Sequence, residues 1–231
     1  AETGRMYIMN IDHANSHSSF KDKVNMSNLC QEITLPTDPI QHIDGEGEIA
    51  LCILSAINVG KISYLDELEG LCDLAVRALD EIIDHQKYPV KAAEVSTKAR
   101  RSLGIGYIGL AHYLAKHKLS YNEKAAWKEV DELTEAFQYY LLKASNQLAQ
   151  EKGKCDYFDR TKYADGILPI DTYKKDVDNI VKRKLSYDWT TLRNNIKSSG
   201  LRHSTLSAQM PSESSSVVSN ATNGIEPPRD Y

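Results

Sequence analysis

Two short, β-prone apolar runs enclose a long helical pattern in this chain of 231 residues. The runs are Glu48–Val59 and Leu103–Ile108, and apolar residues recur at helical spacing through Ser63–Gln86 between them. The recurring residues form one stripe: Leu65, Leu68, Leu71, Cys72, Ala75, Leu79, Ile82 and Ile83. A strand, a helix and a second strand in succession favour an α/β fold with a parallel sheet. The pattern alone fits an open sheet or a barrel.

Helical patterns recur through the rest of the chain. The longest begins near Asn122 and ends at Gly153, because glycine commonly terminates helices. Shorter helices are expected after Ile108 through Lys118, from Asp171 or Thr172 to Lys182, from the cap Asp188 to Gly200, and from a start within Ser212–Ser216. These helices, inserted between strands, complete the α/β pattern.

Two further segments have strand character, namely Arg5–Ile11 and Leu201–Met210. His13–Asn25 is polar and has no regular period, so it is expected to be a loop. Pro36–Gly47 is rich in Pro, Asp and Gly and predicts a turn-rich connection.

The glycines Gly104, Gly106 and Gly109 match the spacing G-x-G-x-x-G. One interpretation is a nicotinamide-binding dehydrogenase, but that fingerprint needs an acidic residue at the end of a following strand. A helical pattern beginning near Asn122 comes next instead. The sequence therefore favours glycines that permit close strand-to-helix packing.

Charge and cysteine usage exclude several classes of protein. The formal net charge is −4 and the pI is about 6.0, which argues against non-specific nucleic-acid binding. No apolar run approaches the roughly 20 residues that span a bilayer. The four cysteines lie far apart without a C-x-x-C pair, and the seven histidines show no metal spacing, so neither a metal site nor a structural disulfide is expected. This composition fits a reducing cytoplasm.

The stretch Ser27–Cys52 contains the residue types of a reactive site. In an extended strand or finger-like loop, alternate side chains share a face, so Asn28, Cys30 and Glu32 are expected to point the same way. A thiol, an amide and a carboxylate on one face suit catalysis, and a second thiol follows at Cys52. The alternatives are buried cysteines, a turn-forming Asn28 and a solvated or paired Glu32.

Six motifs in order resemble the large, catalytic subunit of class I ribonucleotide reductase, in its bacterial and phage form. The first motif is Asn-Leu-Cys-x-Glu-Ile within Ser27–Ile33. The others are Gly47–Gly60, Arg100–Ala115, Gln138–Ala149, Tyr163–Asp178 and Met210–Arg229. Together they extend over essentially the whole chain, and several motifs in one order are far more specific than one.

The resemblance implies a ten-stranded α/β barrel with a finger loop through its centre. Residues 1–231 would form one partial barrel, roughly the second half, with inserted helices. The amino-terminal allosteric domain, the first half of the barrel and the carboxy-terminal tail are expected to lie outside this chain. The isolated chain is therefore expected to be inactive.

The resemblance also implies roles for individual residues. Cys30 would carry a thiyl radical that removes the 3′-hydrogen of the sugar, while Glu32 takes the 3′-hydroxyl proton and Asn28 orients the hydroxyls. Cys52 would be one of two cysteines that reduce the 2′ position, with its partner outside the chain. The residues matching the substrate-phosphate site are Glu213, Ser214, Ser215 and Ser216. A Ser-rich helix start suits a phosphate physically, and equally suits an ordinary helix cap.

The resemblance further implies partners but no cofactor held by this segment. The substrate would be a ribonucleoside diphosphate, the radical would come from a metal-containing small subunit, and thioredoxin or glutaredoxin would restore the thiols. Allosteric nucleotides, ATP and deoxynucleoside triphosphates, would bind the missing regions. The alternative is a non-catalytic scaffold, one piece of a split barrel protein that closes when its partner docks.

Overall fold

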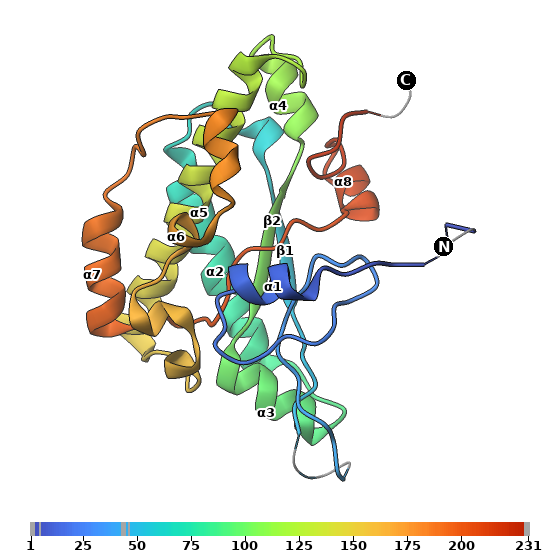
Figure 1. Ribbon diagram of the computed structural model, residues 1–231, viewed down its shortest axis with the longest axis vertical. Helices are drawn as coiled ribbons and strands as arrows, with labels where there is room; N and C mark the ends of the chain where they lie inside the picture. The colour runs from blue at the N-terminus through green and yellow to red at the C-terminus, as the bar shows by residue number, and fades with distance from the viewer. Residues whose placement is uncertain (1–2, 5, 43–44, 46, 229–231) are drawn as a thin grey trace.

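The computed structural model describes residues 3–4, 6–42, 45 and 47–228 (Figure 1). Its elements in chain order are α1 (Ile11–His17), β1 (Ile53–Asn58), α2 (Glu67–His85), α3 (Lys91–Arg100), β2 (Leu103–Ile108), α4 (Leu110–Lys116), α5 (Lys124–Lys152), α6 (Pro169–Thr172), α7 (Trp189–Ser199) and α8 (Glu213–Val218). Short 3₁₀ helices occupy Val59–Lys61, Phe158–Arg160, Lys162–Asp165 and Lys175–Asn179.

The sheet is parallel, as the sequence pattern predicts. β1 and β2 pair in register from Ile53 opposite Leu103 to Asn58 opposite Ile108. The segment predicted as a strand at Leu201–Met210 runs beside β2, but it forms only an isolated parallel bridge, between Ile105 and Ser207. The described residues therefore form a mixed α/β structure with three parallel segments.

The helices lie against the sheet in layers (Figure 1). α2 packs on both strands, α5 packs on α2, and α7 packs on α5. Their inward residues make one large core that includes Leu68, Leu79, Leu133, Leu141, Ile196 and the buried Cys72. The interpretation of Cys72 as a core residue is confirmed. A separate small cluster of Phe20, Val24 and Leu35 supports the region before β1.

Several predicted helix boundaries are confirmed or nearly so. α5 ends at Gly153, whose φ is +89°, a conformation that favours glycine. α7 begins after Asp188, whose carboxylate accepts a hydrogen bond from the backbone N–H of Thr191 at 2.9 Å. α2 starts later than predicted, because the Glu67 carboxylate accepts the backbone N–H groups of Ser63 and Tyr64 and holds them in a turn.

The predictions at the beginning of the chain are wrong. Residues 6–10 have no regular structure, and the predicted loop His13–Asn25 begins inside helix α1; Arg5 lies outside the described residues. The Lys162 ammonium donates to the last-turn carbonyls of Asn15 and Ser16, each at 2.9 Å. A contact from the far end of the chain thus stabilises a helix that the local pattern does not indicate.

The helix predicted from Asp171 or Thr172 to Lys182 is also wrong. The chain forms one turn at α6 and a separate 3₁₀ helix at Lys175–Asn179. The Asp171 carboxylate accepts the N–H of Leu168 at 2.8 Å and pairs with Arg193, so Asp171 lies inside the turn and closes it rather than starting a longer helix.

The sequence patterns missed α3 and misplaced the start of β1. α3 buries polar residues, among them Arg100 at 2% exposure, so it lacks the apolar stripe that reveals a helix. Arg100 pairs with Glu48, which lies inside the run predicted as a strand. β1 consequently begins at Ile53, and Cys52 lies directly before the strand rather than within it.

Candidate functional site

The loop that bears Cys30 is a tight turn, so the predicted extended arrangement of Asn28, Cys30 and Glu32 is wrong. The backbone N–H of Gln31 donates to the carbonyl of Asn28 at 3.1 Å, and Gln31 has a φ of +61°. The side-chain oxygen of Asn28 accepts the N–H of Ile33 at 3.1 Å. Asn28 therefore shapes the turn, which agrees with the alternative interpretation of a turn residue.

The turn presents Cys30 at its tip. Cys30 is exposed, and its neighbour Leu29 is 76% exposed. Among the residues that the structure describes, no hydrogen bond joins the side chains of Asn28, Cys30 and Glu32 to one another. The thiol of Cys30 is thus open to solvent in this chain.

Glu32 and Cys52 lie close enough to interact. One carboxylate oxygen of Glu32, Oε2, is buried and has no hydrogen-bond partner among the described residues. Burial of Cys52, together with the negative charge of Glu32, raises the pKa of the Cys52 thiol to about 12. Cys52 therefore keeps its proton at neutral pH.

Gly104 and Gly106 leave one face of β2 without side chains, and neighbouring atoms pack directly against the strand there. A Cβ atom placed on Gly104 would lie 2.7 Å from the sulfur of Cys52, and one on Gly106 would lie 2.5 Å from the carbonyl oxygen of Ala208. Gly109 has a φ of +81° and contacts Asn58 and Gly60. The glycines permit close packing as expected, but the predicted contact with a helix is wrong at Gly104 and Gly106, whose neighbours are Cys52, Leu54, Ala208 and Met210.

α8 begins within the predicted range, and two of its serine hydroxyls donate hydrogen bonds to backbone carbonyls of the same segment. Ser215 Oγ donates to the carbonyl of Ser212 at 3.2 Å, and Ser216 Oγ donates to the carbonyl of Glu213 at 2.8 Å. Ser212 Oγ is buried without a hydrogen-bond partner among the residues the structure describes. A hollow of about 350 Å³, lined in part by Glu213 and Ser216, opens beside this helix.

β2 connects the two parts of the candidate site. Cys52 lies against Gly104 near the amino end of β2, while the N–H of Gly109 beyond its carboxyl end donates to Thr222 in the loop after α8 at 2.9 Å. The strand rise of about 3.3 Å per residue places roughly 13 Å between Gly104 and Ile108. The thiol and the Ser-rich helix therefore lie toward opposite ends of one strand.

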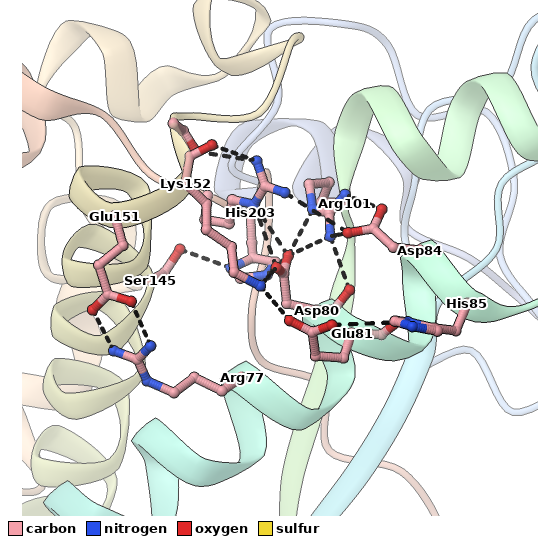
Figure 2. A network of polar contacts seen from close by, with 12 residues as sticks. Arg77, Asp80, Glu81, Asp84, His85, Arg101, Ser145, Glu151, Lys152 and His203 are labelled. Carbon is pink, nitrogen blue, oxygen red and sulfur yellow. Dashed lines mark hydrogen bonds and ion pairs between the residues drawn. The ribbon is translucent and has the colours of Figure 1, made fainter.

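A buried polar network, which no sequence pattern revealed, lies among α2, α5 and the ends of the sheet segments (Figure 2). Asp80 is 0% exposed and accepts from Arg101 Nε at 2.6 Å, from Arg202 Nε at 3.2 Å and from His203 Nε2 at 3.2 Å. Ser145 Oγ lies 2.9 Å from Nδ1 of the same histidine. Burial alone would raise the pKa of Asp80, but His203 and Arg101 lower it below its ordinary value. Ser145, His203 and Asp80 are all fully buried, so this row of groups stabilises the fold and is closed to substrates.

The described residues contain no helix that is both long and apolar enough to cross a membrane. In the same part of the chain, no three His, Cys, Asp or Glu side chains are arranged to hold a metal ion.

The chain belongs to the family whose model is described as the ribonucleotide reductase barrel domain, because that model matches residues 1–231. The chain is 60% identical to ribonucleoside-diphosphate reductase subunit alpha of Haemophilus influenzae and 59% identical to ribonucleoside-diphosphate reductase 1 subunit alpha of Escherichia coli, in both cases over 100% of this chain. It is 45% identical to the subunit alpha of Enterobacteria phage T4 over 98% of this chain. The resemblance inferred from the motifs is confirmed. The chain covers 31%, 31% and 30% of these relatives, so it corresponds to a segment of each.

Proposed function

We propose that this chain supplies the radical-bearing thiol and one reducing thiol of a ribonucleoside-diphosphate reductase. The observation that carries the proposal is the placement of Glu32 beside Cys52 in a chain that matches the reductase barrel throughout. The reaction would convert ribonucleoside diphosphates to deoxyribonucleoside diphosphates, which supply DNA synthesis. The three relatives described above carry the name ribonucleoside-diphosphate reductase, which states this activity.

Radical chemistry solves a specific problem in this reaction. Hydroxide leaves a ribose 2′-carbon poorly, so displacement by an ordinary nucleophile fails. A thiyl radical on Cys30 would take the 3′-hydrogen atom, which restores the Cys30 S–H bond and leaves a carbon radical next to the 2′-hydroxyl. That hydroxyl then departs as water once it is protonated. The open position of Cys30 at the tip of its turn supports this role, because the sugar must reach the sulfur.

Glu32 and Cys52 suit the remaining proton and hydrogen transfers. The unpartnered oxygen of Glu32 is available to accept the 3′-hydroxyl proton, as a general base must be. Cys52 remains a thiol at neutral pH, so it has a hydrogen to give to the 2′ position. A second thiol, outside this chain, would supply the other electron and the proton for the leaving hydroxyl, so that the two sulfurs end as a disulfide. Cys30 would then return its hydrogen atom to the 3′-carbon, which restores the thiyl radical. Asn28 would orient the sugar hydroxyls through the amide NH₂ that its turn-forming oxygen leaves free.

The start of α8 would bind the substrate diphosphate. The first N–H groups of a helix, here those of Glu213, Ser214 and Ser215, have no intrahelical partner and attract anions. The hydroxyls of Ser214 and Ser212 add donors at the same end, and Ser212 Oγ is buried with no hydrogen-bond partner among the described residues, whereas the Ser216 hydroxyl already donates to the carbonyl of Glu213. Glu213 would contribute through its backbone, because its carboxylate repels phosphate.

Substitution of a serine at this helix start tests the diphosphate assignment. Ser214→Ala is expected to raise KM for the ribonucleoside diphosphate about tenfold with kcat little changed, because a hydrogen bond to a charged group contributes about 1.5 kcal/mol. Ser219→Ala, just beyond the end of the same helix, is the matched control and should leave KM within twofold. Steady-state kinetics of the assembled enzyme measure both. Equal KM values for the two variants would refute the assignment.

The complete reaction would require partners. These are the remaining parts of the subunit, a metal-containing small subunit as the source of the radical, and thioredoxin or glutaredoxin as the reductant, all of which suit a cytoplasmic setting. This segment itself would bind no cofactor, and allosteric nucleotides would bind elsewhere in the subunit. Exposed apolar residues on α2, namely Leu71, Leu74 and Ile82, together with Leu54 on β1, support packing against the remaining parts.

Reconstitution tests the proposed function, and assay of Cys30→Ser in the reconstituted complex separates it from a non-catalytic scaffold. The chain alone is expected to form no deoxyribonucleotide, because the second reducing thiol lies outside it. Addition of the remaining subunit parts, the small subunit and a dithiol reductant is expected to produce turnover, measured by chromatography of the reduced nucleotides. Turnover by the chain alone would contradict the proposal.

A further inference from the structure

The face of β2 that carries Gly104 has no side chain between the strand and the Cys52 sulfur. A Cβ atom added to residue 104 would have three close neighbours: Leu54 Cδ2 at 2.5 Å, Cys52 Sγ at 2.7 Å and Ala208 Cβ at 3.2 Å. Real Cβ atoms do not approach other heavy atoms below about 3 Å. The position of the sulfur therefore depends on the absence of a side chain at this residue.

The two glycines of this face differ in what a methyl group would displace. At Gly106 the nearest atom is the backbone oxygen of Ala208, at 2.5 Å, so an added methyl must shift the chain. At Gly104 all three nearest atoms belong to side chains. Gly104 lies in the regular strand β2, in register with Leu54, so alanine can adopt its backbone conformation. A methyl group at Gly104 can thus be accommodated by rotation of the Leu54 and Cys52 side chains together with a shift of a few tenths of an ångström at Ala208.

We infer that Gly104 is a positioning residue for Cys52. The absence of a side chain at residue 104 leaves the space in which the Cys52 sulfur packs against β2 and beside Glu32. The inference rests on the proposed role of Cys52 in the reduction. Leu54 has a second side-chain torsion that can turn its Cδ2 aside, whereas Cys52 has a single side-chain torsion and its sulfur must swing away from β2. That rotation would move the thiol out of this buried space and away from Glu32. Burial and the negative charge of Glu32 are the two features that keep the thiol protonated.

The reactivity of Cys52 tests this inference directly. In the complete, reduced α subunit that carries this segment, iodoacetamide labels each thiol at a rate that follows its thiolate fraction and its exposure. Gly104→Ala is expected to raise the labelling rate of Cys52 at pH 8 at least fivefold, measured by mass spectrometry of the peptide that contains it. Gly70→Ala adds the same methyl group in α2, where nothing lies within 4 Å, and should leave the rate within twofold.

Two buried thiols report whether the variant remains folded. Cys72 and Cys155 should stay unlabelled in Gly104→Ala, as in the unchanged protein. If Leu54 cannot turn away and the variant opens, Gly104→Ala combined with Leu54→Ala removes that contact and should show the raised Cys52 rate with both reporters protected. An unchanged Cys52 rate in a folded variant would overturn the inference. Labelling of Cys72 or Cys155 in both variants would overturn it too, because the methyl would then shift the fold rather than the sulfur.

Turnover separates this inference from the proposed function. Gly104→Ala is expected to lower kcat at least tenfold, with KM within twofold, because substrate binding does not involve the space in which the Cys52 sulfur packs. Cys52→Ser tests the proposed function on its own. If Cys52→Ser retains full turnover, the role of Cys52 is wrong, while the labelling rates still decide whether Gly104 positions its sulfur.

Discussion

Cys30→Ser in the assembled reductase is expected to lower deoxyribonucleotide formation by on the order of 10³-fold or more, since no neighbouring group can replace the reacting atom. An S–H bond is weak enough to be exchanged for a C–H bond of the sugar, and the O–H bond of serine is not. Cys30 lies exposed at the tip of its turn, so the substitution leaves the core untouched. KM and the melting temperature should therefore change little. Chromatography of the nucleotide products and thermal unfolding measure the two effects.

A second cysteine substitution provides the control for this loss. Cys72→Ala removes a thiol buried between α2 and α5, so it should cost stability and leave turnover within about twofold at a temperature well below unfolding. Full turnover by Cys30→Ser would remove the thiyl assignment and would support the scaffold alternative. Equal losses in both variants would indicate a general effect of thiol removal rather than a role for Cys30.

Asp80→Asn is expected to lower the free energy of unfolding by about 3–5 kcal/mol, because breaking a buried ion pair leaves uncompensated charge. Asp80 is 0% exposed and accepts hydrogen bonds from Arg101, Arg202 and His203. An amide at this position keeps the shape but loses the charge that these donors face. Denaturant unfolding followed by circular dichroism measures the change.

The partly exposed acid of the same network is the matched control. Asp84 also pairs with Arg101 but is 41% exposed, so Asp84→Asn should cost about 1 kcal/mol or less. A cost for Asp80→Asn no larger than that for Asp84→Asn would contradict the prediction.

Acid should act on this network in the same direction as Asp80→Asn. The pKa of Asp80 is lower in the folded chain than its ordinary value, so its contribution to stability is present above the unfolded pKa of about 4. That contribution is lost as the pH falls through the folded pKa. The difference in unfolding free energy between the unchanged chain and Asp80→Asn should therefore shrink below pH 4.

Elements with strong local signals were predictable from the sequence. β2, α5 and α7 each combine a clear apolar period with a recognised end, such as Gly153 or the cap Asp188. α1 depends instead on Lys162, which contacts it from a distant segment. α3 buries charged residues, so its period is hidden. Local patterns fail where a tertiary contact decides the conformation.

The sequence motifs named candidate residues for the site but did not predict their geometry. The alternation rule placed Asn28, Cys30 and Glu32 on one extended face, whereas Gln31 turns the chain with a φ of +61°. No spacing rule connects Gly104 to Cys52, because their contact arises only when β1 and β2 pair. The space that holds the Cys52 sulfur therefore exists only when the sheet is folded.

The small cluster of Phe20, Val24 and Leu35 is separate from the main core, and it supports the candidate site independently of that core. Ile33 and Cys52 both pack against this cluster. A region with few buried contacts opens at a lower free energy than the body of a protein. The segment that bears Cys30 is therefore expected to open at a lower free energy than the helical layers, which would change the distance between the Cys30 and Cys52 sulfurs without unfolding the molecule.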